Sequence, residues 1–237
     1  MQKFQGIKPD GLFLLAENRF NDSKSFYEEH KAQIKEYVVN PVYDLINDLS
    51  PALSALDNEM ELTPYKMVSR VRRDNRYTND KSMYRENMWV MFQRDKRRFN
   101  YRQPCMWFEF TPDHFNYGIG LYWCDAKMMT AFRLVLDDHG EEFLKAASKI
   151  KKIGIEPKLQ TYKKDRSEGK NEKLKLYYNA KELYFISEAR PLDSLFDGSV
   201  EEELLTAIKA FSPMYKLLLK VTERVLDNSS GEEKENG

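Results

Sequence analysis

The chain has 237 residues, 41% of them hydrophobic and 13% aromatic, a composition typical of a globular protein rather than a disordered one. Its 38 Lys and Arg residues are balanced by 38 Asp and Glu residues, so no global field attracts nucleic acid or a membrane surface. No apolar run is long enough for a transmembrane helix, and the start of the chain lacks the apolar core of a signal peptide. We therefore expect a cytoplasmic protein. Its two cysteines are too few for a disulfide framework or a cysteine-based zinc site.

Helical patterns fill the first quarter of the sequence. The stretch "PDGLFLLAEN", which begins at Pro9, predicts a short first helix. Apolar residues then recur at steps of three and four from Phe26 to Leu56, the period of one helix face. Because Pro41 and Pro51 interrupt this pattern, we expect kinks or abutting helices there.

Three short runs of aromatic and apolar residues predict strands, at Met88–Gln93, Cys105–Phe110 and Gly118–Trp123. Helices followed by strands and further helices indicate an α+β fold. We expect N-terminal helices, a central antiparallel sheet with hairpins, and more helices packed on it.

The second half of the chain predicts mainly helices. Asp125 is expected to cap a helix that Gly140 ends, and a second helix follows directly. The stretches "LKLYY" and "LYFIS" suggest a late hairpin. The last helix is expected at Val200–Val225. We expect residues 1–225 to form a single domain and residues 226–237 to form a disordered tail.

The segment from Lys66 to Arg102 is strongly cationic, although the chain as a whole is neutral. Twelve Lys and Arg residues oppose four Asp and Glu residues there, a local net charge of +8. The densest part is "SRVRRDNRYTNDKSMYREN", at Ser69–Asn87. Three interpretations of this segment stay open.

In the first interpretation, arginines pair with Asp74 and Asp80 and fix a loop to the core, a purely structural role. In the second, converging guanidinium groups hold the phosphate or carboxylate of a small anionic ligand. On an extended strand that continues from Val68, the side chains of Arg70, Arg72 and Arg76 would share one side.

The third interpretation is an interaction with nucleic acid or with another protein. The stretch "RDKRRFNYRQ", at Arg94–Gln103, interleaves cations with aromatic residues at the tip of a predicted hairpin. Such a tip could follow a phosphate backbone and stack on bases.

The cationic segment resembles the signature of the domain-of-unknown-function 2461 family, which reads approximately R-I-x-R-D-x-R-F-S-K-D-K-x-P-Y-K-x-N. The stretch "NDSKSFYEEHK", from Asn21, is similar to the family's N-N-x-x-x-W-F segment, and "GIGLYW", from Gly118, to its glycine strand ending in Trp. The resemblance covers most of the first half of the chain. It implies a helical first third followed by an antiparallel sheet, and it implies no activity. The signature positions matched in register are Arg70, Arg73, Asp74, Arg76, Asp80, Lys81, Tyr84 and Asn87.

The last two predicted strands suggest a hairpin, which we expect to be centred between His114 and Phe115. One face of that hairpin would be core. The other would place Trp107 opposite Tyr122, Glu109 opposite Gly120 and Cys105 opposite Cys124.

That second face has two interpretations. It is either a half-polar sheet face that meets solvent, or a shallow groove floored by Gly118 and Gly120 and walled by Trp107 and Tyr122. In the groove, Glu109 would act as an acid, a base or an ion-pair partner. The two cysteines are expected to stay reduced.

The leading hypothesis is an anionic small molecule bound by the cationic segment and the hairpin face. Whether a reaction is catalysed stays open, and Glu109 and Asp74 are the candidates for proton transfer. Any cofactor stays unknown, since nucleotide-binding glycine motifs and a H-E-x-x-H motif are absent, and no metal is expected, because the three histidines are scattered. The candidate ligand-binding residues are Arg70, Arg73, Arg76, Lys81, Trp107 and Tyr122.

Overall fold

The computed structural model describes residues 3–76, 78–95, 97, 102–121 and 124–235, with side chains described as far as residue 226. As the sequence predicts, the chain is an α+β protein, with helices before and after an antiparallel sheet. Residues 1–225, predicted as a single domain, contribute to two compact units. Unit 1 is Met1–Phe92, Trp107–Tyr117 and Glu188–Thr206, and unit 2 is Gln93–Met106, Gly118–Ser187 and Ala207–Gly237.

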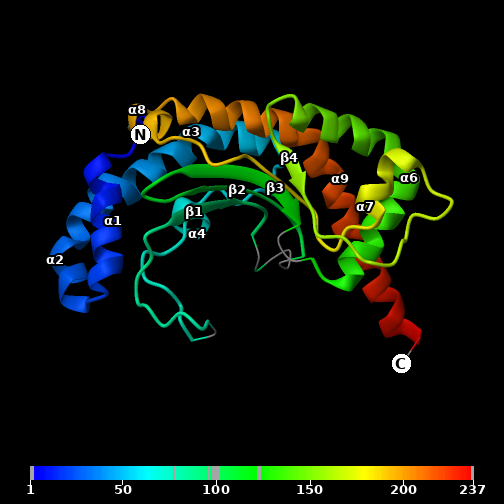
Figure 1. Cartoon of the computed structure of the whole chain (residues 1–237), viewed down its shortest axis with the longest axis horizontal. Coiled ribbons are helices and arrows are strands. Elements are labelled where there is room, and N and C mark those ends of the chain that lie inside the picture. The colour runs from blue at the N-terminus through cyan, green and yellow to red at the C-terminus, as the bar shows by residue number, and fades with distance from the viewer. Residues whose placement is uncertain (1–2, 77, 96, 98–101, 122–123, 236–237) are drawn as a thin grey trace. The chain divides into compact units, whose positions relative to one another are not determined.

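Unit 1 begins with the predicted helices. They are α1 (Pro9–Asn21), α2 (Lys24–Ile34), the π-helical turn η1 (Lys35–Val39), α3 (Asn40–Leu56) and the single turn α4 (Pro64–Met67). Figure 1 shows α1 and α2 side by side. The apolar face of α3 is fully buried, through Val42, Leu45, Ile46, Leu49 and Leu53.

The predicted irregularity at Pro41 is the π turn η1, which ends two residues before that proline. Proline lacks an N–H group, and its ring clashes with the carbonyl of the preceding helical turn. A wider π turn accommodates this loss without ending the helix. Pro51 lies inside α3, which continues past it to Leu56.

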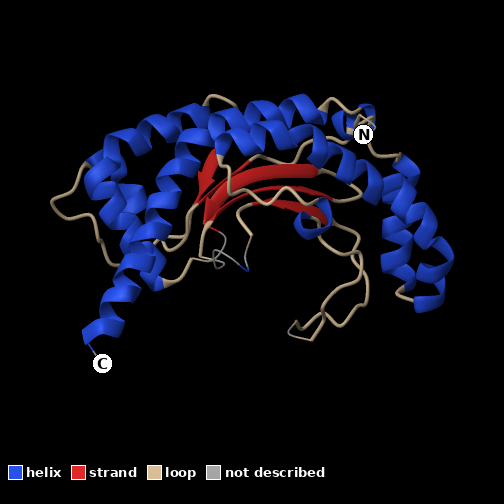
Figure 2. Ribbon diagram, turned by 180° about the vertical axis from the view of Figure 1, so that it is seen from behind, coloured by secondary structure: helices blue, strands red, loops and turns tan. Residues whose placement is uncertain are grey.

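The described strands form one sheet in the order β1-β2-β3-β5-β4 (Figure 2). The predicted strands are β1 (Met88–Phe92), β2 (Pro104–Phe110) and β3 (Phe115–Leu121). Two short strands complete the sheet, β4 (Glu156–Lys158), which the sequence pattern does not reveal, and β5 (Tyr184–Ile186). β5 pairs antiparallel with both β3 and β4.

The turn between β2 and β3 corrects the predicted hairpin register. The backbone N–H of Thr111 donates to the carbonyl of His114 (2.8 Å), so the loop is Pro112–Asp113 and not a point between His114 and Phe115. Thr111 Oγ1 also accepts from the backbone N–H of Asp113 and of His114 (3.2 and 3.1 Å). Proline and aspartate favour a tight turn. Continuing the ladder places Glu109 opposite Asn116 and not opposite Gly120.

One face of β2 is core, as predicted. Met106, Phe108 and Phe110 are buried on it, whereas Trp107 and Glu109 on the other face are half-buried.

The helices of unit 2 differ from the prediction at two places. Asp125 does cap α6 (Ala126–Lys151), because its Oδ1 accepts from the backbone N–H of Met128 (2.9 Å). The break between the two predicted helices is present as a kink with non-helical backbone at His139 (φ −128°, ψ 23°), but it lies one residue before Gly140.

The second difference is "LKLYY", which is helical and not a strand. It forms the end of the 3₁₀ turn η2 (Glu172–Leu174) and all of α7 (Lys175–Tyr178). Asn171 caps this turn by accepting from the backbone N–H of Lys173 (3.0 Å), and such a cap favours helix over strand.

Two helices complete the chain. α8 (Asp193–Asp197) belongs to unit 1. α9 (Val200–Glu235) begins in unit 1, continues in unit 2, and extends into the segment predicted as a tail. Within the described part of the chain, no helix combines the length and the apolar character needed to cross a membrane.

Candidate functional site

The signature segment of unit 1 folds back on itself as a narrow antiparallel ribbon. The N–H of Arg73 donates to the carbonyl of Met83 (2.8 Å), and the N–H of Arg85 to that of Val71 (3.0 Å). An isolated bridge joins Arg72 to Tyr84 between them. The backbone from residue 71 to residue 73 is therefore fixed by its own hydrogen bonds.

The turn between α1 and α2 holds the second strand of this ribbon. Asp22 Oδ1 accepts from the backbone N–H of Met83 (2.7 Å) and of Tyr84 (3.2 Å). The rings of Tyr27 and Tyr84 stack with their centroids 4.8 Å apart. The two segments that resemble the family in sequence thus contact each other, although about sixty residues separate them.

Asp74 binds Arg76 in a two-pronged ion pair. Arg76 Nε donates to Asp74 Oδ1 (2.8 Å) and Arg76 Nη2 to Asp74 Oδ2 (2.6 Å). These hydrogen bonds lower the pKa of Asp74 to about 2, so its carboxylate is a weak proton acceptor at neutral pH. Arg76 is therefore occupied by an internal carboxylate.

Asp80 binds two arginines. Arg73 Nη1 donates to Asp80 Oδ2 (2.6 Å), and Arg19 Nη2 lies 3.5 Å from the same oxygen. The hydrogen bond from the backbone N–H of Ser82 (3.0 Å) and the charges of both arginines lower the pKa of Asp80 below its usual range. Arg19 comes from α1, so this centre is a second connection between the ribbon and the helices.

Two arginines of the ribbon have no such partner. Arg70 and Arg72 are exposed, and among the described residues no carboxylate oxygen lies within 4.0 Å of either guanidinium group. They flank the buried Val71.

Lys81 contacts only the ribbon itself within the described part of the chain. Its Nζ donates to the carbonyl of Asn75 (3.1 Å), and Asn75 Nδ2 donates back to the carbonyl of Lys81 (2.8 Å). This reciprocal pair closes the base of the loop.

The hairpin-face candidates lie partly outside the described residues. Asn87, the last signature position, donates from Nδ2 to Glu109 Oε1 (2.6 Å), so Glu109 is attached to the end of the ribbon. Trp107 is half-buried on the same face of β2. Tyr122 lies outside the described residues.

Gly120 does not form the floor of an open groove. A Cβ atom built there would lie 2.4 Å from the carbonyl oxygen of Leu183 and 2.7 Å from Tyr184 Cα. The close approach that this glycine permits is that of the neighbouring strand β5. The predicted groove is therefore filled at Gly120 by the protein backbone.

Sequence reasoning missed several buried polar atoms of unit 1, in α1 and in the ribbon. Asn18 of α1 is fully buried, and both polar atoms of its amide lack a hydrogen-bond partner in the described structure. Ser82 Oγ and Arg73 Nε are buried and unpartnered as well. The helical period does place Asn18 one turn before Asp22, but no sequence signal shows that its side chain is buried.

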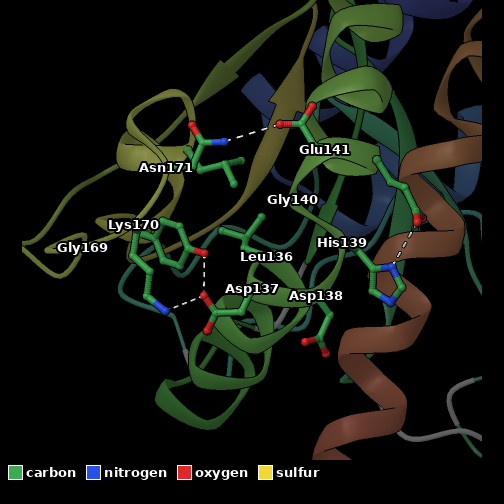
Figure 3. A pocket seen from close by; sticks show the side chains of 12 residues that line it. Leu136, Asp137, Asp138, His139, Gly140, Glu141, Gly169, Lys170 and Asn171 are labelled. Carbon is green, nitrogen blue, oxygen red and sulfur yellow. Dashed lines mark hydrogen bonds and ion pairs between the residues drawn. The ribbon is translucent and has the colours of Figure 1, made fainter.

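A cavity of about 370 Å³ lies in unit 2, at the kink of α6 (Figure 3). Asp137 accepts there from Lys170 Nζ (2.6 Å) and from the hydroxyl of Tyr178 (2.7 Å). His139 Nδ1 lies 3.2 Å from Glu142 Oε1. Asp137 and Lys170 thus form an ion pair in a lining that also carries the acids Asp138, Glu141 and Glu142.

Metal ligands do not gather anywhere in the described residues: no group of three His, Cys, Asp or Glu side chains is placed to hold an ion. Cys105 and Cys124 are both in the thiol form. Of the basic tip, residues 96 and 98–101 lie outside the described residues, and Arg102 forms an ion pair with Asp125 (2.6 Å).

Residues 12–217 match the family described as conserved hypothetical protein (DUF2461). The match covers most of the chain, so the chain belongs to this family. No curated protein matches it.

Proposed function

We propose that this member of the family binds a small molecule bearing a phosphate or carboxylate group, and that Arg70 and Arg72 make the primary contacts. The observation that supports this proposal is their pairing pattern. Both guanidinium groups are exposed, and among the described residues neither has a carboxylate within 4.0 Å, whereas the neighbouring Arg73 and Arg76 are each held by an aspartate. Arg70 acts on Asp74 only through its charge.

In this proposal, two interpretations of the cationic segment both hold, for different arginines. Arg73 and Arg76 have the structural role, and Arg70 and Arg72 bind the ligand. Asp80 and Asp22 tie the ribbon to the helices, and Asp74 occupies Arg76. The backbone that carries Arg70 and Arg72 is consequently held in place before any ligand arrives. A backbone that is already fixed loses little further freedom on binding, and the planar N–H groups of the two arginines match a carboxylate or phosphate.

Lys81, Arg73 and Arg76 are secondary in this proposal, since each donates to a protein acceptor. The proposal assigns binding and no reaction. A cytoplasmic location is part of it, and the two free thiols fit a reducing compartment.

Thermal unfolding with and without inorganic phosphate and citrate tests the proposal. A ligand that binds only the folded protein stabilises it by RT ln(1 + [L]/Kd), so the melting temperature rises with the logarithm of the ligand concentration above Kd. We expect this stabilisation for the wild type and its loss in the double variant Arg70→Ala, Arg72→Ala. Both side chains are exposed, so this variant should melt close to the wild type without ligand.

Lys35→Ala is the matched control, because it removes an exposed cation of the same unit from the turn η1. It should keep the full stabilisation. If Lys35→Ala loses as much stabilisation as the double variant does, the effect is general charge screening and the assignment to Arg70 and Arg72 fails.

A further inference from the structure

Tyr162 of unit 2 lies among three cationic side chains. The ring centroid is 3.9 Å from Arg166 Cζ, 5.5 Å from Lys181 Nζ and 5.7 Å from Arg133 Cζ. The three cations come from α6, from the loop after β4 and from the turn before β5. Residues far apart in the sequence are thus gathered around one aromatic ring.

Backbone contacts hold these segments together. The carbonyl oxygen of Asn179 accepts from the backbone N–H of Tyr162 (2.8 Å), and the side-chain oxygen of Asn179 accepts from the backbone N–H of Arg166 (2.7 Å). The N–H of Lys181 donates to the carbonyl of Gln160 (2.7 Å). The arrangement around Tyr162 is therefore fixed by main-chain hydrogen bonds and not only by mobile side chains.

Arg133 is oriented by three carbonyl groups. Its Nε donates to the carbonyl of Tyr178 (2.8 Å), its Nη1 to that of Met129 (2.9 Å) and its Nη2 to that of Ala180 (2.9 Å). A guanidinium group has five N–H donors, so two remain for another acceptor. Neutral carbonyls orient this charge without neutralising it.

The positive charge of this cluster is not compensated. In the part of the chain that the structure describes, no carboxylate lies within 4.0 Å of Arg133, Arg166 or Lys181. The nearby acid Asp165 accepts instead from Ser167 Oγ (2.5 Å) and from Asn179 Nδ2 (3.0 Å). Partial burial and then the charge of Arg166 lower the pKa of Arg133, a sign that the two cations repel each other.

We propose that Arg133, Arg166 and Lys181 form an anion-binding site that takes the phosphate or diphosphate group of a small molecule beside the Tyr162 ring. An anion there relieves the repulsion between like charges and uses the two remaining N–H groups of Arg133. The Tyr162 ring offers an apolar surface next to the charges. This site lies in unit 2 and goes beyond the function proposed for Arg70 and Arg72 of unit 1.

Calorimetric titration with pyrophosphate at low ionic strength tests this site. The protein used is the full chain carrying Arg70→Ala and Arg72→Ala, so that the other proposed site does not contribute. We expect saturable binding there, and at least about a tenfold weaker Kd, which corresponds to about 1.4 kcal/mol, when Arg166→Ala and Lys181→Ala are added. Both of these side chains are exposed, whereas Arg133 is left intact because it satisfies buried carbonyls.

Lys209→Ala on α9 is the matched control, since it removes another exposed cation of unit 2. It should leave the Kd unchanged. Equal weakening by Lys209→Ala, or no saturable binding at millimolar pyrophosphate, would overturn the site. Either result leaves the proposal for Arg70 and Arg72 untouched, because that proposal is measured by the loss of stabilisation in the Arg70→Ala, Arg72→Ala variant.

Discussion

Asp22 and Met83 are joined by a hydrogen bond of 2.7 Å from the backbone N–H of Met83 to the carboxylate of Asp22. Asp22 also has a left-handed backbone conformation (φ 44°), which aspartate and asparagine tolerate better than most residues. One residue therefore ends α1 and anchors the ribbon that carries Arg70 and Arg72.

Replacing Asp22 tests this anchor. We expect Asp22→Ala to lower the free energy of unfolding by about 1–3 kcal/mol, because two backbone N–H groups lose a charged acceptor. Asp22→Asn keeps an acceptor oxygen and tolerates the same backbone conformation, so it should lose less. Urea unfolding of the three proteins measures the difference. Equal losses in both variants would show that neither the neutral acceptor nor the backbone tolerance of asparagine replaces the charged carboxylate.

Replacing Asn18 by an apolar residue of similar size should stabilise the folded protein. A fully buried amide without a hydrogen-bond partner costs about 1–3 kcal/mol relative to an apolar group of similar shape. We therefore expect Asn18→Leu to raise the urea midpoint, and Asn18→Ala to lower it by leaving a cavity. A decrease in both variants would mean that the amide has a stabilising partner.

The pair of Asp74 and Arg76 predicts an acid-sensitive contribution to stability. The pKa of Asp74 is about 2 in the folded protein, below its usual value, so the folded state binds fewer protons. The stabilisation is present above the unfolded pKa and is lost as the pH falls from about 4 to about 2. Urea midpoints of wild type and Asp74→Asn should therefore converge over this interval.

Salt provides the control for this prediction. Because Arg76 and Asp74 are exposed, about 1 M salt, with a Debye length of about 3 Å, should reduce the difference between the two proteins above pH 4. A difference that persists at high salt would indicate that Asp74 acts through another contact.

A side chain added at Gly120 should clash with the neighbouring strand. Its added Cβ atom would lie too close to the backbone of Leu183 and Tyr184, which belongs to the paired strand and cannot move aside alone. We expect Gly120→Ala to cost about 1–3 kcal/mol or more. At Gly140 the close neighbour is only the end of the flexible Leu174 side chain, so Gly140→Ala should cost less. Thermal unfolding of both variants compares them, and a tolerated Gly120→Ala would reopen the predicted groove.

The local elements could be predicted because local patterns determine them. The period from Phe26 to Leu56, the aromatic strands and the cap at Asp125 each rest on neighbouring residues, and α1, α3, β1 and α6 are found where these signals lie. The exceptions have local causes as well. The Pro112–Asp113 turn shifts the hairpin register, and the Asn171 cap makes a helix of a segment whose apolar residues also fit a strand.

The partners of the arginines could not be predicted. The sequence shows that Asp74 and Asp80 lie among cations, but not that Arg19 of α1 shares Asp80 or that Asp22 bonds to the backbone at Met83. The cluster around Tyr162 depends on a hydrogen-bond network that joins three segments far apart in the sequence. Tertiary contacts determine which cations have no carboxylate nearby, and the periodic pattern of a sequence does not reveal these contacts.

The NMR signal of each arginine Nε–H group during titration with inorganic phosphate distinguishes the arginines that bind a ligand from those held by aspartates. We expect saturable shifts for Arg70 and Arg72, with little change for Arg76, whose Nε–H is held by Asp74. Shifts that appear first at Arg76, or no shift at Arg70 and Arg72 at millimolar phosphate, would contradict binding by Arg70 and Arg72.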